Sequence, residues 1–346
     1  LAEIAPDFPD TSFAWGTTVD TFKDKGVENV FAYTTNASEG GYVQGVMAAK
    51  LTKSKKIGVV GPIAVGDALL YVEGFKKGVK ATDPSVEVLE VYTGSFSDVA
   101  LASQAAQTHI DAGADILTGT GQMVVGAIGV AKEKKVLWFS TQATQASLAP
   151  EIVVSAQVYD WTDAIKQIIS NVQKGTKGGE VYTLSLKNGG LKMEFNPGYK
   201  LADEVKAAAD ETIKGIVDGK IDATVSPEAK PAATAAPSAA PTEEAKPAAT
   251  EEKAAATEAA AAPAAGSGEV FRIAVVTPST KNDLAFSQSM YDALVKIQKE
   301  MGGPDKLEIA ISESMFKVED AAAAIRDYAS QGYNLVIAHG SQYGTS

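Results

Sequence analysis

Short apolar runs rich in β-branched residues alternate with helical stretches along the chain, and this alternation limits its possible folds more than any other feature. The runs are 55–62, 86–94, 114–121, 135–141, 151–157, 271–279, 306–314 and 333–341. The amphipathic stretches between them include 67–81, 98–112, 285–301 and 318–331. Apolar strands separated by helices of this length are typical of parallel βαβ units. The sequence therefore predicts the α/β class.

Several of the predicted strands end in small or polar residues, for example YTGS at 92–95, TGTGQ at 118–122 and HGSQ at 339–342. In open parallel sheets, ligands bind just outside the carboxyl ends of the strands. We therefore expect a binding site where these strand ends meet.

Composition excludes several classes of function. The chain has no Cys and only two His, so disulfides, Cys-ligated zinc and iron–sulfur clusters are excluded, and we expect no metal and no cofactor. A net charge of −12 without a basic patch argues against binding to nucleic acid or to an anionic membrane surface. No window reaches the roughly 18 apolar residues of a membrane span, so no membrane insertion is expected. The segment LAEIAPDFPD does not have the pattern of a signal peptide, and a chain without Cys has no lipobox.

Motifs for catalysis are also missing. The glycine-containing segments 61–68 and 119–126 lack the ending of a phosphate-binding loop and the spacing of a dinucleotide fingerprint. The two histidines, His109 and His339, are not part of a recognisable nucleophile motif. We therefore expect no enzymatic reaction.

The composition changes abruptly between 226 and 268, where nearly all residues are Ala, Pro, Glu, Thr or Lys. This stretch contains no aromatic or large aliphatic side chain, so it cannot bury enough apolar surface to offset the entropy of ordering. The segment 225–268 is therefore predicted to be a disordered linker.

Longer motifs occur on both sides of this linker. They are FRIAVVTPSTKNDLAFSQSMYDAL (271–294), EGGYVQGVMAAKL (39–51), EGFKKGVKATDPSVEVLEVYTGSFSD (73–98) and AGADILTGTG (112–121). Together they resemble the basic membrane protein family, the purine-nucleoside-type lipoproteins that bind substrates for ABC importers. The resemblance implies a type I periplasmic-binding-protein fold, in which two Rossmann-like lobes close about a hinge.

The same resemblance implies a function. The chain would be a solute-binding protein of an ABC importer that traps a purine nucleobase, nucleoside or similar neutral heterocycle by hinge closure. Its partners would be this small molecule and an ABC permease, and it would be a monomer. In its native context it would lie at the periplasmic or extracellular face as a membrane-tethered lipoprotein.

The matching segments occur in a different order from that of the family. The beginning of the family resembles 271–346, and its continuation resembles 1–225, so the chain is expected to be circularly permuted. Lobe I would then comprise 271–346, 1–52 and about 151–176. Lobe II would comprise 53–150 and about 177–224.

The resemblance also suggests residues that bind the ligand. In the family, the Phe of an SFNQ-like motif and the Phe of GSFSD lie at the cleft, which carries over to Phe286 and Phe96, and aromatic rings offer flat faces for stacking. Amide and carboxylate groups could hydrogen-bond the edge of a heterocycle. The full expected set is Phe286, Phe96, Asn282, Asp283, Trp15, Gln122, Gln142, Trp161 and Tyr343. The alternative explanation is core packing for the aromatic members and turn chemistry for the polar ones.

Two departures from the family bear on the ligand. Gly16 and Gln142 stand where nucleoside-binding members have carboxylates for the ribose hydroxyls. The family's lysine is also absent, with Val158 or Tyr159 at that place. A buried hydroxyl without its acceptor is costly, so we expect a free base to be preferred over its nucleoside.

Two other functions remain open. The permuted order would also suit an engineered binding or sensor module for the same class of ligand. An α/β enzyme that processes nucleosides or sugars would need a base or nucleophile paired within the cleft, which the two isolated histidines do not offer.

Overall fold

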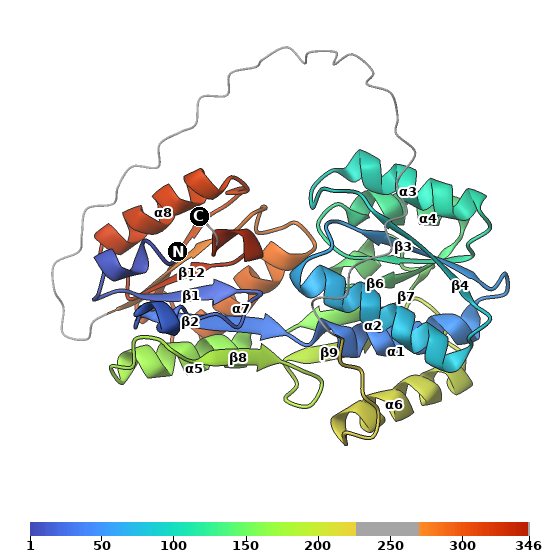
Figure 1. Ribbon diagram of the computed structural model, residues 1–346, viewed down its shortest axis with the longest axis horizontal. Coiled ribbons are helices and arrows are strands. Elements are labelled where there is room, and N and C mark those ends of the chain that lie inside the picture. Colours follow the sequence, from blue (N-terminus) through green and yellow to red (C-terminus); the bar gives the residue numbers. More distant parts are fainter. Residues whose placement is uncertain (226–269, 345–346) are drawn as a thin grey trace, which may run out of the picture.

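The computed structural model describes residues 1–225 and 270–344, which form two six-stranded sheets (Figure 1). The first sheet contains β1 (Ser12–Gly16), β2 (Val30–Thr35), β8 (Val181–Leu184), β10 (Phe271–Val276), β11 (Leu307–Ser312) and β12 (Leu335–Ala338). Its spatial order is β11-β10-β12-β1-β2-β8. Neighbouring strands of this sheet are all parallel.

The second sheet has a closely related arrangement. It contains β3 (Lys56–Gly61), β4 (Glu87–Tyr92), β5 (Ile116–Gly119), β6 (Leu137–Ser140), β7 (Val153–Tyr159) and β9 (Leu191–Phe195). Its spatial order is β4-β3-β5-β6-β7-β9. The pairings are parallel except the last, in which β9 runs antiparallel to β7.

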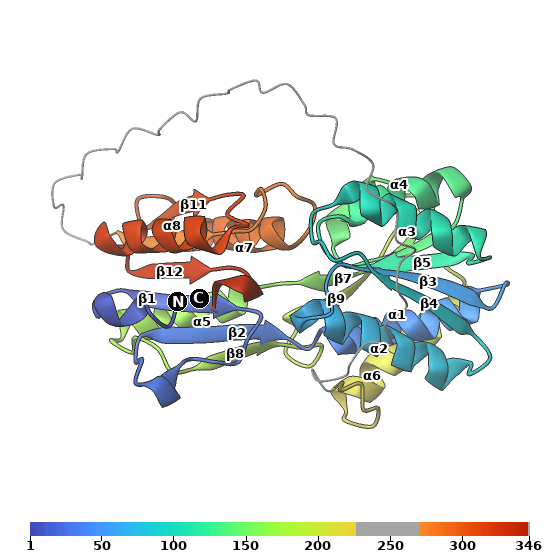
Figure 2. The same ribbon diagram turned by 45° about the horizontal axis from the view of Figure 1, so that its top comes forward.

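Helices cover both faces of each sheet, and we call each sheet with its helices a lobe. The helices are α1 (Ala37–Leu51), α2 (Gly66–Thr82), α3 (Val99–Asp111), α4 (Val124–Lys134), α5 (Thr162–Gln173), α6 (Asp203–Val217), α7 (Phe286–Glu300) and α8 (Val318–Ser330). In lobe I, which contains the first sheet, α5 and α7 cover one face and α8 the other (Figure 2). In lobe II, α1 and α2 cover one face and α3 and α4 the other, while α6 packs on α1. Short 3₁₀ helices are η1 (Ala5–Asp7), η2 (Lys23–Lys25), η3 (Ala143–Ser147) and η4 (Ser341–Tyr343).

The α/β class predicted from the sequence is confirmed. Each of the eight predicted apolar runs coincides with one strand, and each of the four predicted amphipathic stretches with one helix, to within two residues at the ends that extend beyond the prediction. The pattern did not single out β1, β2, β8, β9, α1, α4, α5 or α6. The strands β8 and β9 are short edge strands that are only partly buried, which leaves them without a continuous apolar run.

Glycines let α1 and α2 pack with their backbones in close contact. A Cβ atom at Gly45 of α1 would lie 2.1 Å from the carbonyl oxygen of Phe75 in α2. A Cβ atom at Gly78 of α2 would lie 2.1 Å from the carbonyl oxygen of Tyr42 in α1. This reciprocal contact fixes α1 to lobe II, although α1 directly follows a strand of lobe I.

Within the described residues, the chain passes between the lobes at three short connections. They lie between β2 and α1, between β7 and α5, and between β8 and β9. A few residues at such connections can absorb the changes in backbone angle that rotate one lobe against the other. The geometry is therefore that of two lobes joined by a hinge.

The observed sheets differ from the expected lobe boundaries at three elements. We expected α1 in lobe I, within 1–52, but it packs on α2 in lobe II. The strand β7, expected in lobe I within 151–176, pairs with β6 in lobe II, and β8, expected in lobe II within 177–224, pairs with β2 in lobe I. A pattern of strands and helices does not reveal on which side of a connection the chain changes sheets. The expected linker 225–268 falls almost wholly on 226–269, outside the described residues.

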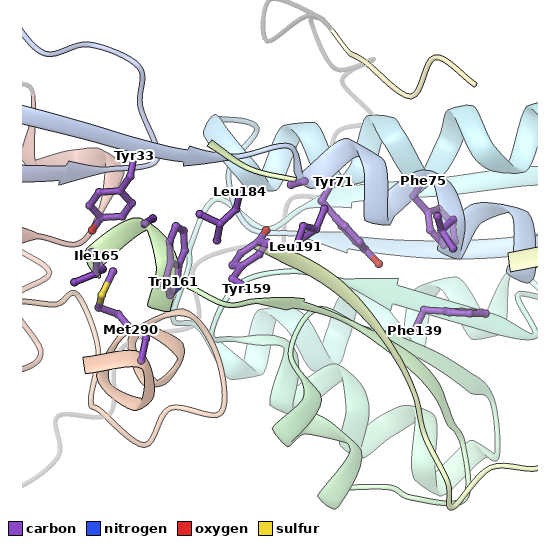
Figure 3. Packing of buried hydrophobic residues seen from close by; sticks show 14 of the residues in the cluster. Tyr33, Tyr71, Phe75, Phe139, Tyr159, Trp161, Ile165, Leu184, Leu191 and Met290 are labelled. Atoms are coloured by element: carbon purple, nitrogen blue, oxygen red, sulfur yellow. The ribbon is translucent and has the colours of Figure 1, made fainter. Parts of the chain in front are cut away.

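One apolar cluster extends through both lobes and across the hinge. Figure 3 shows its aromatic side chains in a row from Tyr33 in lobe I, through Trp161 and Tyr159, to Tyr71 and Phe139 in lobe II. The connection between β7 and α5 is thus part of the core. Close packing of these buried rings restricts the positions of the side chains that contact them.

Candidate functional site

A cavity of about 550 Å³ lies between the carboxyl ends of the strands of the two sheets, which is the place expected from the polar strand ends. Its polar lining residues are Thr17, Asp67, Thr120, Gln122, Thr141, Gln142, Tyr159, Ser341 and Gln342. Its other lining residues are Ile63, Val65, Gly66, Ala68, Phe96, Gly121, Pro278, Ala285, Phe286, Phe316, Val318 and Gly340. A largely apolar cavity with a few polar groups is typical of a small-molecule site.

Phe286 is the most firmly held aromatic residue of this cavity. It begins α7, and its ring stacks on the imidazole of His339 with 3.7 Å between ring centroids and 5° between ring planes. The edge of Trp161 contacts it at a centroid distance of 6.0 Å and an angle of 89°. Since His339 covers one face of the Phe286 ring, the other face is the one that a ligand in the cavity could use.

Two hydrogen bonds fix the orientation of His339. Its Nε2 lies 3.1 Å from the carbonyl oxygen of Phe286, which can only accept, so Nε2 donates. Its Nδ1 then accepts from the hydroxyl of Tyr33 at 2.8 Å. Burial lowers the pKa of His339 to about 3, against the opposing effect of the bond to Phe286, so the ring is neutral. His339 therefore positions Phe286 and does not line the cavity itself.

Trp161 also helps to hold the Phe286 ring, through the edge-to-face contact described above. It is fully buried at the connection between β7 and α5, and its Nε1 donates to the hydroxyl of Ser289 in α7 at 2.9 Å. Its ring also contacts Tyr33 edge to face at a centroid distance of 5.2 Å. We expected Trp161 at the ligand, but it lies in the core behind Phe286.

Four of the nine side chains expected at the site line the cavity. They are Phe286, Phe96, Gln122 and Gln142. The Oε1 atom of Gln122 is buried and has no hydrogen-bond partner within the described residues, so it is available to a ligand donor. The ligand contacts of all four residues remain predictions.

The two polar residues before α7 have local roles instead. The carboxylate of Asp283 accepts hydrogen bonds from the backbone N–H groups of Ala285 at 2.8 Å and Gln288 at 3.1 Å, so it caps the helix. Asn282 is exposed. Neither residue lines the cavity, which agrees with the turn chemistry considered as the alternative.

Trp15 and Tyr343 pack in the core of lobe I. The indole of Trp15 stacks on Phe22 at a centroid distance of 4.9 Å, and its Nε1 donates to the carbonyl oxygen of Gly340 at 3.2 Å. The hydroxyl of Tyr343 donates to the carbonyl oxygen of Met315 at 2.8 Å. Both side chains hold the loop after β12 in place, and neither lines the cavity.

Asp67 lines the cavity and was missed in the sequence analysis. It lies in the first turn of α2, where an acidic residue is common because it favours the positive end of the helix dipole. The segment 61–68 that contains it was considered only as a phosphate-binding loop. The useful signal would have been its place directly after the strand β3, at the same sheet edge as Gln122 and Gln142.

The mouth of the cavity is apolar. Ile63 and Val65 come from lobe II and Phe316 from lobe I, with exposed fractions of 37%, 43% and 46%. Large apolar side chains that are exposed beside a cavity gain from being covered. They lie on opposite lobes, so closure of the lobes would bring them together.

A second cavity of about 230 Å³ is a weaker candidate. Its lining includes Asp160, Lys192 and Lys296, and the Asp160 carboxylate lies 2.6 Å from the Lys192 Nζ and 3.8 Å from the Lys296 Nζ. The two lysines thus neutralise Asp160, and the smaller volume leaves less room for a ligand. Among the described residues, no three or more His, Cys, Asp or Glu side chains gather in a way that could hold a metal ion. No helix in this part of the chain is both long enough and apolar enough to cross a membrane.

Two doubly wound sheets, joined at short connections and enclosing a cavity between their strand ends, define the type I periplasmic-binding-protein fold. The chain belongs to the family described as ABC transporter substrate-binding protein PnrA-like, whose model matches residues 1–226 and 270–345. The resemblance drawn from the sequence motifs is thereby confirmed. This is a family of substrate-binding proteins, which agrees with the expectation of no enzymatic reaction.

Several curated proteins are similar to this chain. A purine-binding protein of Brucella abortus is 29% identical over 228 residues, which cover 66% of this chain and 63% of that protein. An ABC transporter nucleoside-binding protein of Lactococcus lactis is 27% identical over 218 residues, which cover 57% and 61%. The chain thus spans less than two thirds of the length of either relative.

Solved structures show a similar fold. An ABC transporter solute-binding protein from Conexibacter woesei has a TM-score of 0.52 and 24% identity, with coverage of 64% of this chain and 74% of that chain. An ABC transporter solute-binding protein from Aeropyrum pernix has a TM-score of 0.55 and 20% identity, with coverage of 64% and 73%. At these identities the likeness concerns the fold alone.

Proposed function

We propose that this chain is the substrate-binding component of an ABC importer and binds a purine nucleobase, a nucleoside or a similar flat, neutral heterocycle. The observation that carries the proposal is the ring of Phe286, which is stacked on His339 and lines an apolar cavity between the lobes. A rigid aromatic face in a largely apolar cavity suits a planar ligand. The names of the purine-binding and nucleoside-binding relatives support this class of ligand.

Binding would be linked to closure of the hinge. Phe286 and Phe96 belong to different lobes, so a heterocycle that contacts both would favour the closed arrangement by its additional affinity for that state. Gln122 and Gln142 would supply hydrogen bonds to the edge of the ligand. No bond of the ligand needs to be broken.

The cavity favours a free base over a nucleoside. A Cβ atom at Gly16 would lie 2.7 Å from the hydroxyl oxygen of Tyr33, so a ribose-binding carboxylate at this position would displace that tyrosine. Asp160 is paired with Lys192 at 2.6 Å and lines the smaller cavity. Neither Gly16 nor Asp160 therefore supplies a carboxylate for ribose hydroxyls in this cavity.

The test is equilibrium dialysis or calorimetry with adenine, guanine, hypoxanthine and their nucleosides. A Phe286→Leu variant removes the stacking face and should weaken binding of the best base at least tenfold, which is about 1.4 kcal/mol. Phe8→Leu, in the partly buried apolar shell of lobe I outside the cavity, is the matched control and should bind like the parent. Equal binding by the parent and Phe286→Leu would contradict the stacking role. Nucleosides that bind tenfold tighter than bases would contradict the preference for bases.

We also propose that the protein works as a monomer with an ABC permease, as a lipoprotein at the periplasmic or extracellular face. The family assignment supports the transport role. Light scattering coupled to size-exclusion chromatography tests the monomer, for which the sequence mass is 35.9 kDa.

We further infer that the order of the chain is permuted relative to a common plan of the two lobes. In lobe II, numbering the strands along the chain from β3 to β7 gives the spatial order 2-1-3-4-5. Lobe I has this same order only when the numbering starts at β10, runs to β12, and continues with β1 and β2. The nitrogen of Leu1 also donates to the carbonyl oxygen of Tyr343 at 3.1 Å, so β12 and β1 are connected in space (Figure 1).

A further inference from the structure

Asp67 is a buried carboxylate that the fold leaves unsatisfied. Both of its oxygens are shielded from solvent, and neither has a hydrogen-bond partner within the described residues. Unpaired buried acceptors are rare because each costs free energy, and a charged one costs more than a neutral one. A group of this kind in a cavity is a candidate for ligand recognition.

The surroundings of Asp67 offer no cation. Among the described residues that line the cavity, none is Lys, Arg or His. The groups that interact electrostatically with Asp67 are the phenols of Tyr33 in β2 and Tyr159 in β7. The hydroxyl of Thr35, at the end of β2, opposes the rise in the pKa of Asp67 that burial causes. Since no hydrogen bond to either Asp67 oxygen is formed within the described residues, both oxygens are open to N–H donors of a ligand.

On the basis of the proposed function, we propose that Asp67 determines ligand specificity by accepting two hydrogen bonds from adjacent N–H groups on the ligand edge. Two parallel N–H donors match the two oxygens of a carboxylate, as in the pairing of a guanidinium with a carboxylate. Guanine carries such an edge, formed by its N1–H and its 2-amino group. The ligand class is thus a planar heterocycle with a guanidine-type edge.

Ribose hydroxyls fit this position less well. A hydroxyl both donates and accepts, so a buried ribose needs donors for its own oxygens as well as acceptors for its hydrogens. A carboxylate supplies acceptors only. An N–H edge has no such second requirement, so it satisfies Asp67 without creating a new unpaired group.

Guanine and hypoxanthine separate the contribution of the second N–H group. Both bases have the 6-oxo group and N1–H, and only guanine has the 2-amino group. Equilibrium dialysis at pH 8 compares the parent, Asp67→Asn and the control Asp203→Asn. Asp203 is an exposed carboxylate in the first turn of α6, outside the cavity, so it matches Asp67 in its position on a helix.

We expect the parent to bind guanine at least tenfold tighter than hypoxanthine. In Asp67→Asn, guanine binding should fall at least tenfold and the ratio of the two affinities should approach one, because the amide replaces one acceptor with a donor. Asp203→Asn should keep the parent's ratio. An unchanged ratio in Asp67→Asn, or an equal loss for both bases, would overturn the proposal.

Further outcomes separate this proposal from the proposed function. If Asp67→Asn weakens the binding of guanosine and of inosine equally and leaves the binding of guanine unchanged, Asp67 binds the ribose and the proposal is wrong. If the parent binds purines without any preference for guanine, the proposed function is retained and the proposed role of Asp67 in specificity is wrong. If the parent binds no purine base or nucleoside at millimolar concentration, both are wrong.

The parent alone provides a second readout if Asp67→Asn does not fold. Lowering the pH from 8 to 5.5 protonates Asp67, so the preference for guanine over hypoxanthine should decline toward one. The facing phenols of Tyr33 and Tyr159 stay neutral over this range, because burial raises the pKa of both. A preference for guanine that is the same at both pH values would overturn the proposal.

Discussion

At the scale of single residues, Asp67 is expected to reduce the stability of the unliganded protein. Burial raises the pKa of Asp67 from 3.8 to about 7. An acid with a raised pKa holds its proton more tightly in the folded state, so its ionisation opposes folding. The cost is absent below about pH 4, grows as the pH rises toward 7 and is constant above.

Asp67→Asn should therefore stabilise the unliganded protein at pH 8 but not at pH 4. A shift of about three pKa units corresponds to at most about 4 kcal/mol. Urea unfolding of both proteins at the two pH values measures the difference. His339, whose lowered pKa of about 3 weakens the fold in acid, is present in both and cancels. The same difference in stability at both pH values would show that ionisation of Asp67 has no part in it.

The aromatic residues that line the cavity could be predicted where a specific motif contains them. Phe286 and Phe96 follow strand ends in specific motifs, and both line the cavity. Trp15 and Trp161 have the same aromatic character but are buried, Trp15 in the core of lobe I and Trp161 at the hinge. A pattern of residues does not show which rings the fold covers. Asp67 was not predicted, because an acidic residue in the first turn of a helix is ordinarily attributed to its favourable interaction with the helix dipole.

At the scale of elements, the contact between α1 and α2 allows a sharp test. Gly45→Ala places a Cβ atom 2.1 Å from the carbonyl oxygen of Phe75, which is backbone and cannot move aside alone. The helices must separate, so we expect a loss of about 2 to 4 kcal/mol in the free energy of unfolding.

Gly129→Ala is the matched control, because no atom lies within 4 Å of the Cβ it would add to α4. Alanine is a better helix former than glycine, so this variant should be neutral or more stable by up to about 1 kcal/mol. Denaturant unfolding compares both variants with the parent. Equal effects of the two substitutions would mean that helix propensity, not close packing, decides stability at Gly45.

The same scale shows why the lobe boundaries were harder to predict than the elements. Periodicity identifies buried strands and amphipathic helices, which depend on local sequence. The assignment of α1 to lobe II depends on glycines that face the backbone of α2, and this contact is tertiary. The pairing of β8 with β2 likewise depends on which sheet edge is open.

At the scale of the whole molecule, the shared strand order of the two lobes gives the proposed permutation a physical meaning. The two lobes share one five-strand order when β10, β11, β12, β1 and β2 are taken as one set and β3 to β7 as the other, with β8 and β9 added at the edges. Parallel strands pair in the same way whichever loop is cut, provided that the cut ends stay close and exposed. The fold then depends on the sheets and their cores, and not on the order of the segments.

A rearranged chain tests this directly. In it, 270–346 would come first, Ser346 would be joined to Leu1, and the chain would end at 225 without 226–269. We expect the same circular dichroism, a Tm within a few degrees of the parent and the same ligand affinity, because Leu1 already contacts Tyr343 and the new link closes only a short loop. A chain opened within α1, between Gln44 and Gly45, is the control and should lose stability, since it cuts the helix that packs on α2. Failure of the rearranged chain to fold or to bind, while the parent does both, would show that the observed segment order is required.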